Sequence, residues 1–374
     1  MTDKPNYQPG LEGIIAGESA ICKVRADVDK LIYRGYDTSV LALEAEFEET
    51  AHLLIEGRLP TKVELSAFKK ELNTHRIIEK PTIELIRALP NTMHPMDVLR
   101  CGVSACAGWD PDVGDNSHDA NVRKAIRLSA KIPVILGVRQ AHLEKRNPVY
   151  PDPTLNHAGN LLWLLTGKKP GEDAIRIMNT SLTLYAEHGF NASTFTARVC
   201  ASTLSDLHSA ITGAIGTLKG PLHGGANEAA MAMLEEIGDA SKAEAWVMEA
   251  LAQKKKIMGF GHRVYRTCDS RSVTLKAEGL KLAQKRGDTK YSEIAEVVEQ
   301  TMKREKNLFT NVDFPCAWVY KLLGLPVDTY TPIFAAARVT GWSAHVIEQH
   351  DNNRLIRPSE DYTGPMEMDY KKPV

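Results

Sequence analysis

The sequence has few cysteines, no long apolar run and no excess of charge of either sign. Its six cysteines are spread over 374 residues without a Cys-x-x-Cys pair, which argues against a disulfide scaffold and for free thiols in a reducing compartment. No uncharged apolar stretch approaches the length that spans a bilayer, and the first residues show no apolar signal region. We therefore expect a cytoplasmic protein without a membrane segment.

The charges are almost balanced. Lys+Arg 46 against Asp+Glu 47 leave a formal net charge of -1, so no global field favours binding to nucleic acid or to an anionic membrane. Any recognition of an anion must therefore be local. With 374 residues, 43% of them hydrophobic, the chain has ample material for a large core and enough length for two or three domains.

Signals for helices dominate the chain. Residues 47–56 form a short apolar-rich helical stretch, and Thr61 opens a capping box that precedes apolar residues on one helical face. Residues 119–145 predict one long helix that is interrupted at Pro133, where we expect a kink. The small residues of 193–220 predict two closely packed helices that are buried at the centre of the protein.

Strand signals are almost absent. Residues 14–24 and 30–36 are short segments, β-branched or aromatic, that are able to pair as a small hairpin near the N-terminus. The sequence has no internal repeat and no low-complexity tract. The pattern predicts an all-α protein of enzyme size, with a short N-terminal β-hairpin as an option.

Three short stretches, far apart in the sequence, each place an acid/base side chain on a glycine-rich or polar turn. They carry His223, His262 and Asp313. Glycine beside a polar side chain lets the backbone approach a ligand closely, at an entropic cost that a purely structural position avoids. Two imidazoles and one carboxylate are enough to remove a proton, stabilise the resulting oxyanion and protonate a second oxygen. The three turns together suggest carbon-acid chemistry.

Each of these stretches also has a structural interpretation. The loop at His223 suits a tight helix–helix turn or a phosphate cradle, although it lacks the Gly-Lys-[Ser/Thr] ending of the phosphate motif. The basic cluster over 254–271 suits a solvated face as well as a polyanionic cofactor. Asp313 suits the N-cap of a helix that begins near Pro315. The residues alone leave these alternatives open.

Two arginines raise a further question. Arg338 lies in an apolar helical stretch, where a cation must be paired, and Arg357 precedes a proline near the C-terminus. A structural ion pair and a bidentate clamp on a small dicarboxylate both account for them. His345, Glu348 and His350 share one helix, but their spacing matches no standard set of metal ligands, so we expect no metal.

Taken together, these motifs resemble the citrate synthase family. The resemblance extends over nearly the whole chain and is carried by residues 10–13, 187–195, 220–228, 256–265, 311–313, 356–358 and 362–365. Within the family, residues 33–37 and 94–97 are most like those of 2-methylcitrate synthases. The chain also resembles the short dimeric citrate synthases, without the extra N-terminal domain of the longer, NADH-regulated ones. One departure is Ser270, where the family usually has proline, and we expect it to loosen the loop that aims Arg271.

The resemblance implies condensation of an acyl-CoA with oxaloacetate, followed by hydrolysis of the thioester, without a metal or a tightly bound cofactor. Asp313 would remove the α-proton, neutral His223 would donate to the enolate oxygen, and His262 would protonate the oxaloacetate carbonyl oxygen. The residues implied to hold the oxaloacetate carboxylates are His188, Arg271, Arg338 and Arg357, the last donated to the partner subunit's site in a homodimer. Those implied to bind CoA are Lys256, Ile257, Met258, Gly259, Phe260 and Arg266.

The resemblance also implies a citrate synthase-like two-domain helical fold. Residues 1–224 and 325–374 would form the large domain, and residues 225–324 a small domain that closes over the site. Propionyl-CoA is the favoured substrate, and we expect acetyl-CoA to be accepted as well. The alternative is a dedicated citrate synthase of the tricarboxylic acid cycle, because the two thioesters differ by one methylene, which a pocket discriminates by only about 1–3 kcal/mol. A metal-dependent hydrolase lacks its ligand spacing, and a non-enzymatic scaffold gives no reason for glycine-flanked histidines.

Overall fold

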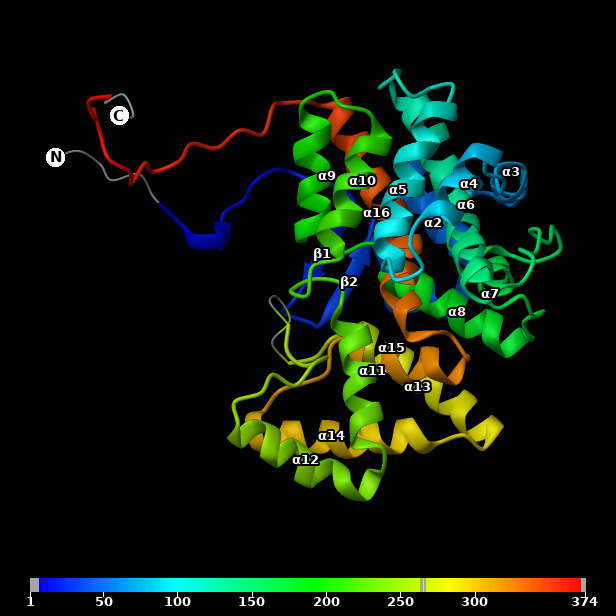
Figure 1. Cartoon of the computed structure of the whole chain (residues 1–374), viewed down its shortest axis with the longest axis vertical. Coiled ribbons are helices and arrows are strands. Elements are labelled where there is room, and N and C mark those ends of the chain that lie inside the picture. Colours follow the sequence, from blue (N-terminus) through cyan, green and yellow to red (C-terminus); the bar gives the residue numbers. More distant parts are fainter. Residues whose placement is uncertain (1–6, 263–264, 266, 371–374) are drawn as a thin grey trace.

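Helices form most of the protein, and one small antiparallel sheet lies near the N-terminus (Figure 1). The computed structural model describes residues 7–262, 265 and 267–370. Its sheet consists of β1 (Cys22–Arg25), β2 (Lys30–Tyr33) and β3 (Tyr36–Asp37), with Cys22 opposite Tyr33 in the β1–β2 register. The predicted hairpin is confirmed, with a shorter first strand and one further short strand.

The first group of helices makes up the upper part of Figure 1. In chain order it contains α1 (Thr38–Glu44), α2 (Phe47–Glu56), α3 (Lys62–Thr74), α4 (Lys80–Ala88), α5 (Pro95–Cys106), α6 (His118–Leu143), α7 (His157–Thr166), α8 (Glu172–Tyr185), α9 (Ala192–Ser202) and α10 (Leu207–Leu218). The last long helix, α16 (Tyr330–Asp351), runs through this group and packs against α2, α5, α6, α8, α9 and α10. It is buried over almost its whole length and forms the centre of the core.

The second group of helices lies below the first in Figure 1. It contains α11 (Ala226–Ile237), α12 (Ala240–Ala252), α13 (Ser270–Arg286), α14 (Lys290–Lys306) and α15 (Asp313–Leu322). Helix α12 packs on α14, α11 packs on α15, and α13 lies between α15 and α8. These five helices fall within residues 225–324; the division into a large and a small domain stays a prediction.

Helix α6 corrects one expectation. It runs without a break from His118 to Leu143 and contains Pro133. The predicted long helix is therefore confirmed and its interruption is wrong, while the kink at Pro133 stays a prediction. A proline inside a helix removes one hydrogen bond and crowds the preceding turn. Residues on both sides of Pro133 are buried against neighbouring helices that include α7 and α16, and this packing keeps the helix continuous.

Helices α9 and α10 form the predicted close pair, but they are not fully buried. Their contact uses small side chains, and Ala197 and Ala210 are fully covered. Val199, Gly213 and Gly216 remain partly exposed, although a Cβ at Gly213 would meet Thr196 of α9 and one at Gly216 would meet Arg100 of α5. The expectation of a buried central pair is therefore met only in part.

The two terminal segments leave the body on the same side (Figure 1). Beyond α16, residues 352–370 contain no helix and are mostly exposed. Within the described part of the chain, none of the helices combines the length and apolarity that crossing a bilayer requires.

Candidate active site

Two of the predicted turns are joined to each other by backbone hydrogen bonds. Gly261 N–H donates to Phe309 O at 2.9 Å, and Asn311 N–H donates to Gly259 O at 2.9 Å. Gly259 has φ +85°, and a Cβ there would lie 2.7 Å from the Phe314 side chain, so this position requires glycine. The pairing brings the segment of His262 beside the start of α15, where Asp313 lies.

Asp313 does not act as a helix cap. It is the first residue of α15, and Asn311 Oδ1 accepts its backbone N–H at 3.1 Å. Its carboxylate oxygen Oδ1 accepts a hydrogen bond of 2.7 Å from the Tyr185 hydroxyl. Burial raises the pKa of Asp313 to about 6, although Tyr185 and Arg271 act in the opposite direction. A carboxylate with this pKa is ionised at neutral pH and still basic enough to take a proton.

His223 is held as a neutral ring in a defined tautomer. Its Nε2 accepts the backbone N–H of Ser193 at 3.3 Å and lies 2.8 Å from Ser193 Oγ. Trp342 Nε1–H donates to the same Oγ at 3.1 Å. Because a backbone N–H only donates, Nε2 is unprotonated and Nδ1 carries the proton. Burial, together with the positive charge of Arg338, lowers the pKa of His223 to about 4, so Nδ1–H is a neutral donor.

His262 has the opposite tautomer. Tyr265 N–H donates to its Nδ1 at 3.1 Å, which places the proton of the neutral ring on Nε2. Burial lowers its pKa to about 4, and Arg271 adds repulsion that Asp269 partly offsets. Its ring lies 5.1 Å from that of His188, between ring centroids. Burial and Arg271 also hold the pKa of His188 well below its usual value.

Arg338 and Arg271 are buried, and each is fixed by hydrogen bonds to a neighbouring residue. Arg338 is 1% exposed, donates from Nε to Tyr185 O at 2.6 Å, and stacks 4.7 Å from the Phe334 ring centre. Arg271 is 4% exposed and donates to both carboxylate oxygens of Asp269, at 3.0 and 2.9 Å. Two buried guanidiniums at one site suit a small dicarboxylate.

Asp269 precedes Ser270, the residue that stands where the family usually has proline, and its carboxylate fixes the backbone around it. Its carboxylate also accepts the backbone N–H groups of Arg271 and Val312, both at 3.1 Å. Ser270 is the first residue of α13, a position that suits proline in other chains. Asp269 thus fixes Arg271 by side chain and backbone at once, which accounts for a well-placed arginine without the proline.

A buried network compensates the positive charge beneath the site. Glu187 is fully buried, and its Oε1 accepts from His345 Nε2 at 3.0 Å. Arg198 Nε–H donates to His345 Nδ1 at 2.9 Å, which fixes the tautomer of that ring. Burial alone would raise the pKa of Glu187. His345 and Arg338 have a larger effect in the opposite direction, so the pKa of Glu187 lies below its ordinary value. His345 therefore links Glu187 to Arg198 by hydrogen bonds. These bonds explain its position in the helix without a metal.

The other predicted residues have a range of environments. Ile257 and Gly259 are buried, Met258 and Phe260 are partly buried, and Lys256 is exposed. Arg266 lies outside the described residues. Arg357 is exposed on the C-terminal segment and follows Ile356, whose backbone N–H donates to Ser202 Oγ at the end of α9 at 3.0 Å.

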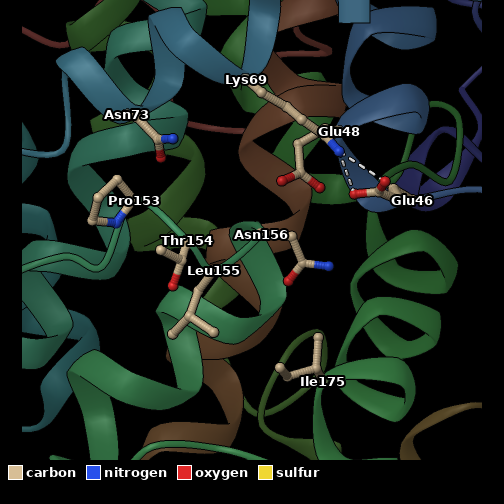
Figure 2. Close-up of a pocket in the computed structure, with 9 residues that line it drawn as sticks. All are labelled: Glu46, Glu48, Lys69, Asn73, Pro153, Thr154, Leu155, Asn156 and Ile175. Carbon is tan, nitrogen blue, oxygen red and sulfur yellow. Dashed lines mark hydrogen bonds and ion pairs between the residues drawn. The ribbon is translucent and has the colours of Figure 1, made fainter. Parts of the chain in front are cut away.

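A separate cavity of about 420 Å³ contains none of the predicted site residues (Figure 2). It is lined by Glu46, Glu48, Lys69, Asn73, Pro153, Thr154, Leu155, Asn156 and Ile175. Lys69 pairs with Glu46 at its edge. The buried Glu48 accepts the backbone N–H of His157 at 2.7 Å, at the first residue of α7. Glu48 therefore stabilises a helix N-terminus, and its burial has a structural explanation.

Known proteins share this sequence and this arrangement. The citrate synthase C-terminal domain family matches residues 10–359. The chain belongs to the citrate synthase family. The citrate/2-methylcitrate synthase of Bacillus subtilis is 43% identical to it over 366 residues, which cover 98% of each chain. The 2-methylcitrate synthase of Shewanella oneidensis is 45% identical over 357 residues, covering 95% of this chain and 94% of the relative.

Solved citrate synthases have the same fold. The enzyme of Thermoplasma acidophilum, solved in a ternary complex with carboxymethyl coenzyme A and oxaloacetate, matches with a TM-score of 0.92 at 34% identity, over 97% of this chain and 98% of that one. The predicted family and all-α fold are thus confirmed. This citrate synthase family member is an acyltransferase of the type that condenses an acyl-CoA with oxaloacetate. Among the described residues, no group of three or more metal-ligating side chains occurs.

Proposed function

We propose that this citrate synthase family enzyme favours propionyl-CoA, accepts acetyl-CoA, and releases 2-methylcitrate or citrate together with free CoA. The observation that carries the proposal is the combination at one site of a carboxylate with a pKa of about 6, two neutral imidazoles and two buried arginines. This set provides a base, two hydrogen-bond donors and a dicarboxylate clamp.

The first step uses Asp313 and His223. The Asp313 carboxylate removes a proton from the α-carbon of the thioester, and the electron pair moves to the carbonyl oxygen. The Nδ1–H of His223 donates to this enolate oxygen, and one such donor is typically worth about 2.7–4 kcal/mol. Because the ring is neutral, it stabilises the enolate by hydrogen bonding and does not need to give up its proton.

The second step uses His262. The enolate carbon attacks the ketone carbon of oxaloacetate, a carbon–carbon bond forms, and the ketone oxygen takes the proton from His262 Nε2. Water then hydrolyses the thioester, which releases CoA and leaves a third carboxylate on the product. Arg271, Arg338 and His188 hold the oxaloacetate carboxylates in this scheme, and the burial of the two arginines keeps their ion pairs strong.

The proposed enzyme is a homodimer in which Arg357 of the partner subunit completes the oxaloacetate site. Two features support this. The partly exposed residues of α9 and α10 include Gly213 and Gly216, and small residues allow helices to approach closely. The terminal segments expose large apolar side chains, including Ile15, Leu355 and Tyr362, which a second copy would cover.

The CoA site is proposed along residues 256–260, with Arg266 as a phosphate contact. The buried backbone at Gly259 and the ring of Phe260, packed 4.8 Å from that of Phe314, give this strip a rigid base. Water has to be excluded during condensation and admitted for hydrolysis, and this requirement supports closure of residues 225–324 over the site.

The preference for propionyl-CoA rests on residues 33–37 and 94–97 and on relatives that carry the name 2-methylcitrate synthase. A dedicated citrate synthase of the tricarboxylic acid cycle is the second candidate, because the relatives also include enzymes named citrate synthase. The two candidates share the mechanism and differ by one methylene of substrate.

The test is release of free thiol from propionyl-CoA and from acetyl-CoA, each with and without oxaloacetate. We expect release from both only when oxaloacetate is present, with the larger kcat/KM for propionyl-CoA. A larger kcat/KM for acetyl-CoA would favour the dedicated citrate synthase. Absence of oxaloacetate-dependent release from either thioester would refute the proposal.

A further inference from the structure

Tyr185 contacts both halves of the candidate site. It is the last residue of α8 and is 1% exposed. Its hydroxyl donates to Asp313 Oδ1 at 2.7 Å, and its carbonyl accepts from Arg338 Nε at 2.6 Å. Its ring packs 4.4 Å from that of Phe334, between centroids. One residue therefore connects the proposed base to the proposed oxaloacetate clamp.

The chemistry of the phenol restricts it to donating. Burial raises the pKa of Tyr185 well above its usual value, and the negative charge of Asp313 raises it further. The hydroxyl therefore keeps its proton at neutral pH. A buried phenol needs a hydrogen-bond partner, and its single proton points to the carboxylate.

We propose that Tyr185 is a positioning residue for the base: its hydroxyl holds Oδ1 of Asp313, so that Oδ2 is the oxygen that takes the α-proton. This inference rests on the proposed function. A carboxylate without such a contact rotates about its terminal bond and presents either oxygen. A hydrogen bond to one oxygen fixes the plane of the group and aims the other.

The same bond keeps the carboxylate ionised. The charged groups that act on Asp313 come from several elements: Arg271 and Asp269 at the start of α13, and Arg338 on α16. Burial raises the pKa of Asp313, and the hydrogen bond from Tyr185 is the largest opposing contribution. Without this bond the carboxylate would hold its proton to higher pH, and less of the base would be ready at neutral pH.

The bond also joins two parts of the chain. Tyr185 ends α8 in the upper helix group, and Asp313 begins α15 in the lower group (Figure 1). If residues 225–324 move as a unit, the base is aimed by a residue of the other domain, so positioning of the base depends on their approach.

The test is the variant Tyr185→Phe, which removes only the hydroxyl. Loss of a hydrogen bond to a charged group shifts its pKa by about one to two units. We therefore expect the pKa of the acid limb in the kcat–pH profile to rise by that amount. At pH 6.5 kcat should fall about tenfold, the part of the loss that comes from protonation of Asp313 should be recovered at pH 9, and the KM for oxaloacetate should stay unchanged. The part that remains at pH 9 is the effect of the lost aim. A merely structural role would lower kcat equally at all pH values and leave the pKa of the acid limb where it is.

Tyr320→Phe is the matched control. Tyr320 is also buried, lies on α15 two turns beyond the base, and bonds Ser181 Oγ at 2.8 Å through its hydroxyl. Its loss should leave the acid limb in place. An unmoved limb in Tyr185→Phe, or the same shift in Tyr320→Phe, would overturn the inference.

A second replacement covers the case in which Tyr185→Phe does not fold. Site-specific 3-fluorotyrosine at position 185 keeps the hydroxyl and makes it a stronger donor, so the limb should move to lower pH; a limb that does not move would overturn the inference. The proposed function fails separately: it fails if the unaltered enzyme shows no oxaloacetate-dependent thiol release, whereas an active enzyme with an unmoved limb contradicts only the role of Tyr185.

Discussion

Asp313→Asn should stop turnover while making the fold more stable. In the folded protein the pKa of Asp313 is about 6, against 3.8 for the free side chain, so the ionised carboxylate costs about 3 kcal/mol of folding free energy at neutral pH. Because the folded pKa is raised, the contribution of Asp313 to stability is most favourable below pH 3.8, falls between pH 3.8 and about 6, and is constant above. Asparagine carries no charge and still accepts from the Tyr185 hydroxyl.

Urea unfolding at pH 7.5 should therefore show Asp313→Asn to be more stable by up to about 3 kcal/mol, and the gain should shrink as the pH falls toward 4. Turnover should drop by about 10²–10⁴-fold, with oxaloacetate binding by calorimetry retained. Asp269→Asn is the control: it leaves the buried Arg271 without its partner and should cost about 3–5 kcal/mol. Loss of stability in Asp313→Asn at pH 7.5, or loss of oxaloacetate binding, would mean that Asp313 is structural.

Three further predictions concern the same site. Turnover of the unaltered enzyme should fall about tenfold per pH unit below pH 6, because the base is then protonated while both histidines remain neutral; a pH profile without this limb contradicts the assignment. Ser193→Ala should lower kcat about 3- to 10-fold by freeing His223, and an unchanged kcat would remove Ser193 from the account. Gly259→Ala should cost about 1–3 kcal/mol in thermal unfolding, since its Cβ meets Phe314; Gly287→Ala, with open space around it, should cost less.

Local signals in the sequence predicted most of the secondary structure. The helix expected over residues 47–56 has those bounds, and the Thr61 capping box forms both of its hydrogen bonds. These features depend on neighbours within a few residues, so the sequence suffices. Pro133 shows the limit of local reasoning, because the packing of α6 among other helices outweighs the local cost of a proline.

The site was predictable only in part. The glycine turns at His223 and His262 were visible as motifs, and family resemblance supplied separate roles for them. The contacts that tune these groups were not visible: Tyr185 and Asp313 are 128 residues apart in the sequence, and Tyr185 looks like an ordinary apolar residue at the end of a helix. Trp342 and Glu187 act through equally long-range contacts, which no local pattern records.

The central claim is that the enzyme removes an α-proton from the acyl-CoA and forms a carbon–carbon bond at that carbon. The direct measurement uses propionyl-CoA with both α-hydrogens replaced by deuterium, together with oxaloacetate, and follows deuterium in the isolated product by mass spectrometry. The account predicts that one of the two α-deuterons is lost for each CoA released. It also predicts that Asp313→Asn removes no deuteron and releases no CoA at a comparable rate. Release of CoA with both deuterons retained in free propionate would show simple thioester hydrolysis and contradict the account.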